Sequence, residues 1–433
     1  MNPVRICPML LAAAALLPAW PAAAETLEDA WRLAIEHNEA LAAASAEVEV
    51  ARANERVARG ARWPSVRASA AYTRLDQAPA LAISSPTLQF RSPPIFAGDD
   101  FVMGSGEVTL PLYTGGQINA GIKAASEALV GATQEAQGAK AALKLDTARA
   151  YVGVLRARRA LRTAESRVAS LAAHAGDVQH MVERELVPTS DLLAARVALA
   201  NAAEERVRAA NGLKIAEATY NRWLGEPLDR VPELDERIPA DPSLASQPLE
   251  ALLKEALESR SEIKALAARA GALASQSRAE LGSLLPQLAL TGSYTYFENE
   301  ILDRQNAAAV GIGIEWNVFD GGQARNRAAA LRGASRAAER RTADLRSLIE
   351  LEVRAASLDV GEARARLAAM HEAVAQAEEN LRTSRELYGA GLATNTQVLD
   401  AVTLRVSAIN NHDDAELDES LALLRLAYAV GTL

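Results

Sequence analysis

The chain has a single cysteine and few aromatic residues. The cysteine, Cys7, lies among the first 24 residues, so the rest of the chain can form no disulfide and offers no thiol chemistry. Aromatic residues make up 4% of the sequence although hydrophobic residues make up 49%, and much of that hydrophobic content is alanine. This composition favours long helices in close contact over a bulky globular core.

The sequence lacks the features that are typical of several functional classes. The net charge is −9 and the basic residues are spread along helical segments, which argues against nucleic acid as a partner. No apolar run is long enough for a transmembrane helix, and no nucleophile elbow, catalytic triad or phosphate-binding loop occurs. The acidic run His412–Glu419 is interpreted as a solvated helix face or an acidic rim. We therefore expect no enzyme, no cofactor and no metal site. The five histidines show no paired ligand spacing: His37, His174, His180, His371 and His412.

Residues 1–24 have the features of a signal peptide. Arg5 supplies positive charge, Met9–Leu17 is a short apolar run, and three alanines precede Glu25 as a cleavage site. Cys7 precedes the apolar run, whereas a lipid-attachment cysteine would follow it, so we expect no lipidation there. The sequence predicts an exported mature chain.

The stretch LYTGGQ at Leu112–Gln117 recurs 206 residues later as VFDGGQ at Val318–Gln323. At this offset Leu110–Gly225 aligns with Trp316–Gly431 without a gap, and nearer the N-terminus the offset is 222. We therefore predict two repeats, residues 25–225 and 249–433, joined by a linker of residues 226–248 whose prolines exclude a helix.

Each repeat is predicted to run helix, strand, loop, strand, long helix, tight turn, helix. The first helix is expected over Leu27–Arg62, where Trp63-Pro64 ends it. Alternating residues predict β-hairpins at 65–113 and 287–319, whose strands have roughly the 9–11 residues of a tilted membrane strand. The proline-containing segment Gln77–Asp100 is predicted to be a longer loop.

A helical pattern without proline covers Gln117–Glu185, a length on the order of 100 Å that only a coiled coil or a tube accommodates. Glycine pairs stand where each strand turns into a long helix, with Thr114 or Asp320 placed to cap it. The junction glycines are Gly115, Gly116, Gly321 and Gly322.

Four strands per chain cannot close into a barrel, and open edges cost several kcal/mol per unpaired group in hydrocarbon. Three copies would supply 12 strands, an even number within the range of outer-membrane barrels. The alternative is a soluble periplasmic coiled-coil adaptor or scaffold whose two hairpins face solvent.

The duplicated plan carries the Gly-Gly junctions, Tyr388-x-x-Gly391-Leu392 before a turn, Val398-Leu399-Asp400-Ala401 after it and a terminal Val430–Leu433. In this order and spacing, Glu25–Leu433 resembles the TolC-type outer-membrane efflux proteins. The resemblance implies an internally duplicated α+β membrane protein. It would form a homotrimer whose 12-stranded outer-membrane β-barrel, with four strands per chain, is continuous with a long periplasmic α-helical barrel.

The function implied by the resemblance is the passive exit duct of a tripartite efflux or type I secretion system. Such a duct lies in the outer-membrane lipid with its helical part in the periplasm. It is gated at its periplasmic tip and opened by a periplasmic adaptor (membrane fusion) protein and an inner-membrane transporter.

The tips, residues 185–191 and 389–397, occupy matching repeat positions. Gly391 suits a helix C-terminus, and Thr394-x-x-Gln397 predicts a capping box. The resemblance implies a gate here, although Ala393 stands where a gate arginine is expected and Gln397 replaces a ring aspartate. Asp400 would line the pore, or else be a solvated residue of a first helical turn. The implied gate residues are Asp400, Gln397, Tyr388, Ser190 and Asp191. The implied adaptor contacts, which could instead pack on one another, are Leu186, Val187, Gly391 and Leu392.

Overall fold

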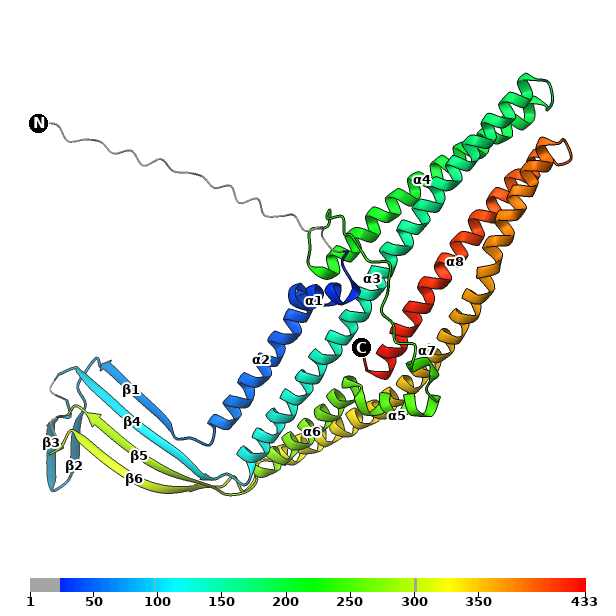
Figure 1. Cartoon of the computed structure of the whole chain (residues 1–433). Helices are drawn as coiled ribbons and strands as arrows, with labels where there is room; N and C mark the ends of the chain where they lie inside the picture. The colour runs from blue at the N-terminus through cyan, green and yellow to red at the C-terminus, as the bar shows by residue number, and fades with distance from the viewer. Residues whose placement is uncertain (1–23, 97, 300–301) are drawn as a thin grey trace, which may run out of the picture.

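A computed structural model describes residues 24–96, 98–299 and 302–433, which form one elongated body with a sheet at one end and paired long helices at the other (Figure 1). Apart from Ala24, the predicted signal peptide lies outside the described residues. No helix in the described part of the chain is both long enough and apolar enough to cross a membrane.

The first repeat contains α1 (Leu27–His37), α2 (Glu39–Gly60), α3 (Gln117–Glu183) and α4 (Thr189–Leu224). The single helix expected over Leu27–Arg62 is therefore wrong, because Asn38 interrupts it in an extended conformation. The Asn38 side chain accepts hydrogen bonds of 3.1 Å from the backbone N–H groups of Ala40 and Leu41. Such local bonding competes with helix continuation, so Asn38 ends α1 and caps α2.

The second repeat contains a 3₁₀ turn (η1, Leu244–Ser246), α5 (Leu249–Ser259), α6 (Ser261–Gly282), α7 (Gln323–Gly389) and α8 (Asn395–Val430). Its α-helices begin and end at the first-repeat positions shifted by 222 or 206 residues. Arg260 stands where Asn38 stands in the first repeat. It is buried and donates to Glu262, Glu352 and the Ala429 carbonyl, so the two repeats break this helix with different chemistry.

The main sheet is antiparallel, with strands in the order β1 (Ser65–Arg74), β4 (Asp100–Tyr113), β5 (Gln287–Phe297) and β6 (Asn306–Glu315). Strands β4 and β5 join the two repeats, for example by pairing Val108 with Gly292. Strands β1 and β6 are the outer edges, and each pairs along one side only. The sheet therefore ends in two open edges.

The loop expected over Gln77–Asp100 is also wrong, because it contains β2 (Ala80–Ser85) and β3 (Leu88–Pro94), which pair as a separate two-stranded sheet. Its prolines lie in the turn (Pro86), at the end of β3 (Pro93 and Pro94) or before β2 (Pro79). Proline is tolerated there because both strands of a lone hairpin are edges.

Buried apolar side chains form three clusters along the rod. One surrounds Tyr151 and Tyr220 of the first repeat and includes Leu417 and Leu421 of α8, and a second surrounds Ile349 and Val353 of the second repeat. The third lies near the tips and combines residues of both repeats, including Leu171, Val178, Leu381, Tyr388 and Val398. This third cluster positions the candidate gate residues.

Candidate functional site

The two tips close their long helices with the same backbone turn. At the second tip Gly391 has φ 74°, and the Leu392 N–H donates to the Leu387 carbonyl over 2.8 Å. At the first tip Glu185, the matching residue, has φ 59°, and the Leu186 N–H donates to the Met181 carbonyl over 2.9 Å. Among the described residues Glu185 is the one non-glycine with a positive φ. The first tip therefore adopts a left-handed turn with a side chain that disfavours it.

The helices that leave the tips begin differently. The predicted capping box of α8 is confirmed: the Thr394 hydroxyl accepts from the Gln397 N–H, and the Gln397 side chain accepts from the Thr394 N–H over 2.8 Å. The side-chain oxygen of Gln397 is thus engaged at the helix start. Helix α4 begins after Pro188 without a side-chain cap.

A hydrogen-bond network, which we call the tip network, joins the two tips within one chain. The Tyr388 hydroxyl donates to Oδ2 of Asp191 over 3.2 Å, and Nδ2 of Asn395 donates to the Asp191 carbonyl over 3.1 Å. Oδ1 of Asn395 lies 2.7 Å from Nε2 of His174, and both of these side chains are buried. His174, Asn395, Asp191 and Tyr388 therefore connect α3, α4, α7 and α8.

The environment of Tyr388 keeps its hydroxyl protonated. Burial and the neighbouring Asp191 carboxylate raise the pKa of Tyr388 to about 12. The Tyr388 ring also lies 5.6 Å from the His174 ring, centroid to centroid. The hydroxyl is therefore a hydrogen-bond donor at every physiological pH.

Within the tip network, Tyr388 and Asp191 were predicted from the sequence, whereas His174 and Asn395 were not. A signal was present, because each polar residue interrupts an apolar stripe at helical spacing. His174 stands between Leu171 and Val178, and Asn395 precedes Val398 and Val402. A polar residue in such a stripe is buried and needs a hydrogen-bond partner.

The other gate candidates lie apart from the tip network. Asp400 and Gln397 are exposed and line a groove of about 580 Å³ between α7 and α8, together with Leu392, Ala393 and Leu404. Asp400 has no ion pair within the part of the chain that the structure describes. Ser190 is exposed in the first turn of α4. The structure thus divides the expected set into a bonded pair, Tyr388 and Asp191, and three exposed residues.

The expected adaptor contacts are mostly exposed. Leu186 and Leu392 expose 64% and 76% of their surface at the ends of the two tips, and Gly391 is also exposed. Val187 differs, because it is half-buried and packs against the apolar cluster below the tips. Each tip therefore exposes one leucine, one from each repeat.

The glycine pairs lie where the strands meet the long helices, and Gly115, Gly116, Gly321 and Gly322 all have φ between 61° and 83°. A Cβ on Gly115 would lie 2.3 Å from the Gly282 carbonyl oxygen, so this position also requires close backbone approach. Of the two expected capping residues, Asp320 accepts from the Gly322 and Ala324 N–H groups over 2.8 and 2.7 Å. Thr114 makes one long contact of 3.5 Å to the Ile118 N–H.

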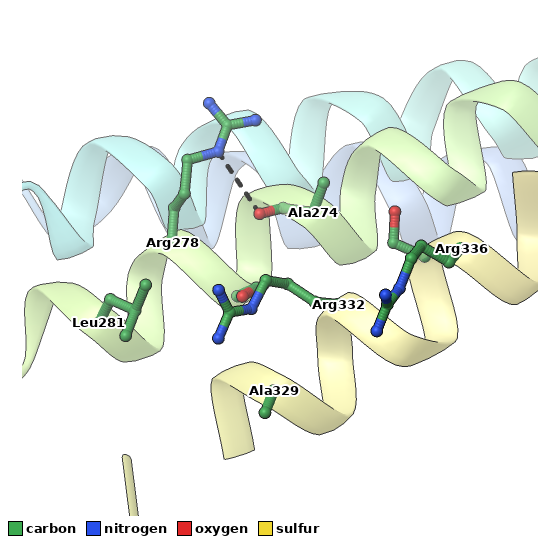
Figure 2. Close-up of a pocket in the computed structure, with 8 residues that line it drawn as sticks. Ala274, Arg278, Leu281, Ala329, Arg332 and Arg336 are labelled. Carbon is green, nitrogen blue, oxygen red and sulfur yellow. Dashed lines mark hydrogen bonds between the residues drawn. The ribbon is translucent and has the colours of Figure 1, made fainter. Parts of the chain in front are cut away.

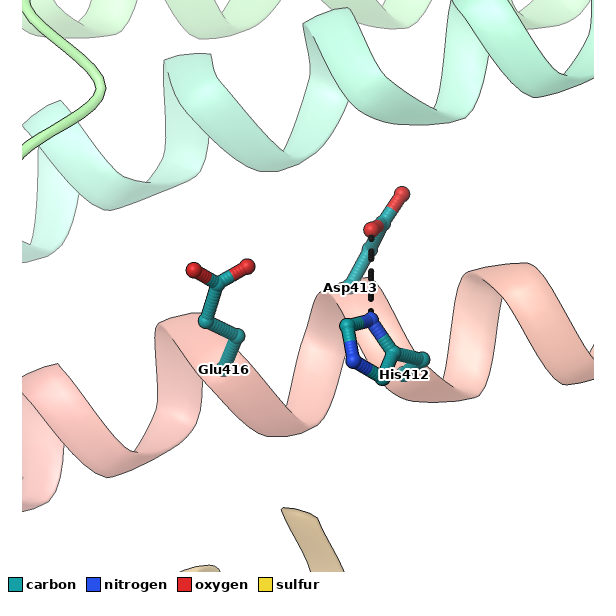
Figure 3. A group of neighbouring side chains, drawn as sticks. All are labelled: His412, Asp413 and Glu416. Carbon is teal, nitrogen blue, oxygen red and sulfur yellow. Dashed lines mark ion pairs between the residues drawn. The ribbon is translucent and has the colours of Figure 1, made fainter. Parts of the chain in front are cut away.

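The acidic run of α8 brings three possible metal ligands together. Ligand atoms of His412, Asp413 and Glu416 lie within 4.8 Å of one another (Figure 3). However, Nη1 of Arg159 lies 2.6 Å from Glu416 and 3.8 Å from Asp413, so an arginine of α3 already occupies the position between the two carboxylates. This donor set does not fit a metal ion. The acidic run is only in part the expected solvated face, because Asp414, Asp418 and Glu419 stay 27–46% exposed but pair with arginines of α3 and α7.

Comparison with known proteins identifies relatives of this fold. The family model described as "Outer membrane efflux protein" matches residues 30–226 and 252–432. The solved structure of the outer-membrane channel OprN superimposes with a TM-score of 0.78 at 20% identity, over 94% of this chain and 90% of that one. The outer membrane protein VceC from Vibrio cholerae gives 0.78 at 19% identity, over 94% and 96%.

The CmeC outer membrane channel of Campylobacter jejuni gives a TM-score of 0.79 at 14% identity, over 94% of this chain and 85% of that one. At such identities the likeness to solved structures shows the fold alone. A comparison with curated proteins finds no match.

Proposed function

The chain belongs to the outer membrane efflux protein family, and we propose that three copies of it join into one passive exit duct. Members of this family are channels and not enzymes, so the chain is an outer-membrane efflux channel with its helical part in the periplasm. This assignment excludes the alternative that the chain is a soluble periplasmic coiled-coil adaptor or scaffold.

The open edges of the sheet carry the proposal of a trimer. Strands β1 and β6 each leave one side without backbone partners, and unpaired N–H and C=O groups cost several kcal/mol each in hydrocarbon. Four strands per copy and three copies give a closed sheet of 12 strands. The outer-membrane lipid surrounds this closed sheet, and the long helices continue it as a tube.

The exposed leucines at the tips support a periplasmic adaptor protein as partner, which would connect the duct to an inner-membrane transporter. Leu186 and Leu392 are large apolar side chains at the far end of the rod, and most of the surface of each is exposed. Exposed apolar side chains that cluster at one end of a molecule are typical of interaction sites. Gly391, with φ 74°, provides the left-handed turn beside Leu392.

We further propose that the tip network holds each pair of tips together in the closed duct. Because Ala393 supplies no arginine, closure depends on hydrogen bonds from Tyr388 and Asn395 to Asp191 instead of on a salt bridge. Asp400, exposed in its groove, would form a ring of three carboxylates in the trimer and attract cations. Asp400→Ala then weakens block of single-channel conductance by divalent cations; unchanged block would remove Asp400 from the pore.

Cell fractionation and conductance together test the proposed function. The mature protein is expected in the outer-membrane fraction and, after purification in detergent, forms ion-conducting channels in planar lipid bilayers. A monomer that stays in the soluble periplasmic fraction and gives no conductance would overturn the proposal.

A further inference from the structure

Helices α2 and α6 occupy equivalent places in the two repeats but differ in burial. Helix α6 buries small residues against α3, whereas α2 has no buried residue. The α6 positions Ala265, Ala268, Ala272, Ser275 and Gly282 are all buried, and their α2 counterparts Ala43, Ala46, Val50, Ala53 and Gly60 are all exposed. Helix α2 therefore exposes a face of small residues. The matching face of α6 is covered by α3, whereas no described helix covers this face of α2.

Helices α3 and α7 show the complementary difference. Gly131 of α3, which lies against Ala268 of α6, and Ala124, two turns earlier, are buried, whereas their α7 counterparts Ala337 and Ala330 are exposed. Helix α7 therefore has an apolar face that no part of the described chain covers.

We infer that the free face of α7 packs against α2 of the next copy in the register that α3 and α6 adopt within one chain. This inference rests on the proposed trimer and adds which faces meet and at which residues. The contact between α3 and α6 joins the first repeat to the second, and the contact between α7 and the next α2 continues the same alternation.

The strands support the same register. Within one chain Val108 of β4 pairs with Gly292 of β5. The matching residues of the other repeat are Ile314 of β6 and Ala70 of β1, so Ile314 is expected to pair with Ala70 of the next copy. Strand β4 continues to Tyr113, but β6 stops at Glu315, and the following Trp316, Val318 and Phe319 are exposed. Pairing with the next β1 would extend β6 over these residues.

We call the contact between α7 and α2 of the next copy the seam. A glutamate and a glycine exchange places there, compared with the contact between α3 and α6. Within one chain Glu127 of α3 lies over Gly271 of α6, because a Cβ on Gly271 would be 3.3 Å from the Glu127 carboxyl carbon. At the corresponding positions α7 has Gly333 and α2 has Glu49, so glycine and glutamate are exchanged. The glutamate of the next copy can therefore lie over the glycine of α7.

Two arginines are placed to receive that glutamate. Arg332 and Arg336 flank Gly333 and line a groove of about 570 Å³ beside Arg278 of α6 (Figure 2). Both are exposed, and neither makes an ion pair with another described residue. Their counterparts in α3, Ser126 and Val130, are uncharged, so the arginines occur only at the free edge. Among the described residues of its own chain, Glu49 forms an ion pair only with its exposed neighbour Arg52, a contact that contributes little stability.

Disulfide trapping tests the register. A Cβ on Gly131 would lie 3.8 Å from the Ala268 Cβ, a separation that suits a disulfide, and the equivalent pair across the seam is Ala337 with Ala46. The double variant Ala46→Cys/Ala337→Cys is expected to link copies covalently in the outer membrane, seen as higher bands on a non-reducing gel. Each single variant, and Ala53→Cys/Ala337→Cys with its cysteine two turns further along α2, is expected to give none.

Charge reversal tests the ion pairs. Glu49→Arg and, separately, Arg332→Glu/Arg336→Glu are expected to lower the temperature at which the detergent-solubilised trimer dissociates, and combining the three changes is expected to restore it. If the trimer forms but the Ala46→Cys/Ala337→Cys variant gives no disulfide between copies, this inference is wrong and the proposed function stands. The same holds if the effects of the charge reversals on the dissociation temperature add instead of compensating. A protein that is monomeric in detergent overturns the proposed function as well.

Discussion

The hydroxyl of Tyr388 donates a 3.2 Å hydrogen bond to Oδ2 of Asp191 and thereby ties the end of α7 to the first turn of α4. The two residues are 197 positions apart and belong to different repeats. Because the two tips come from different repeats, this bond holds together elements that could otherwise separate. It is therefore the most direct structural candidate for a latch.

Tyr388→Phe is expected to raise the open probability of single channels. The change removes the hydroxyl but leaves the ring, which is packed in the apolar cluster below the tips, so only the hydrogen bond is lost. Such a bond contributes about 0.5–1.5 kcal/mol, which corresponds to roughly a two- to tenfold change in a closed–open equilibrium. Single-channel recording checks this, and an unchanged open probability would show that the bond does not hold the gate.

The raised pKa of Tyr388 predicts how the latch depends on pH. Tyrosine has an ordinary pKa near 10, and here the folded-state pKa is raised to about 12. The stabilisation is fully present below pH 10 and is lost as the pH rises through about 12, because only the neutral hydroxyl can donate to Asp191. An ultraviolet titration of wild type minus Tyr388→Phe should give one ionisation near pH 12. A midpoint near 10 would mean that the Tyr388–Asp191 contact does not persist in solution.

His174 and Asn395 are expected to depend on each other. His174→Ala leaves the buried Asn395 side chain with an unsatisfied oxygen, and Asn395→Ala does the same to the His174 ring, at about 1–3 kcal/mol each. Thermal unfolding of the two single variants and the double variant should show that the double variant loses less than the sum. Simple additivity would indicate that the two side chains do not interact.

Glu185→Gly is expected to stabilise the first tip by about 1 kcal/mol, because glycine adopts a positive φ without the steric penalty that glutamate incurs. Gly391→Ala at the matching position of the second tip should destabilise by a similar amount. Hydrogen exchange of the tip amides is the suitable measurement, since it reports local opening. Slower exchange in Gly391→Ala than in wild type would contradict the assignment.

Gly321→Ala is expected to impair assembly more than it impairs the single chain. Within one chain a Cβ at Gly321 meets nothing within 4 Å, whereas a Cβ at the matching Gly115 would be 2.3 Å from Gly282. Gly60 of the next copy takes the place of Gly282 in the inferred seam, so the clash appears only between copies. Gly322→Ala, also at positive φ, is the control for backbone strain. Equal trimer yields for the two variants would count against the seam.

The sequence predicted the features that are local or that repeat. The glycine pairs and the Thr394–Gln397 capping box depend on a few neighbouring residues, and the duplication is visible by aligning the chain with itself. The helix break at Asn38 was not predicted because the apolar pattern of α1 continues past this residue, even though asparagine is a good N-cap. The hairpin of β2 and β3 was not predicted because its prolines suggested a loop. An isolated hairpin has only edge strands, and edge strands tolerate proline.

The residues of the proposed gate could be predicted only in part from the sequence. The contact of His174 with Asn395 spans 221 positions, and their approach depends on how two helical hairpins pack, which no short motif encodes. The same holds for the arginines that receive the acidic run of α8. Charge pattern along one helix shows that a residue is polar, but not which residue of another helix it meets.

The proposed duct requires that other copies of the chain close the open β1 and β6 edges. Native mass spectrometry of the protein extracted from outer membranes in mild detergent measures the number of copies directly. We predict a complex of three copies. A stable single copy that retains its sheet would contradict the account.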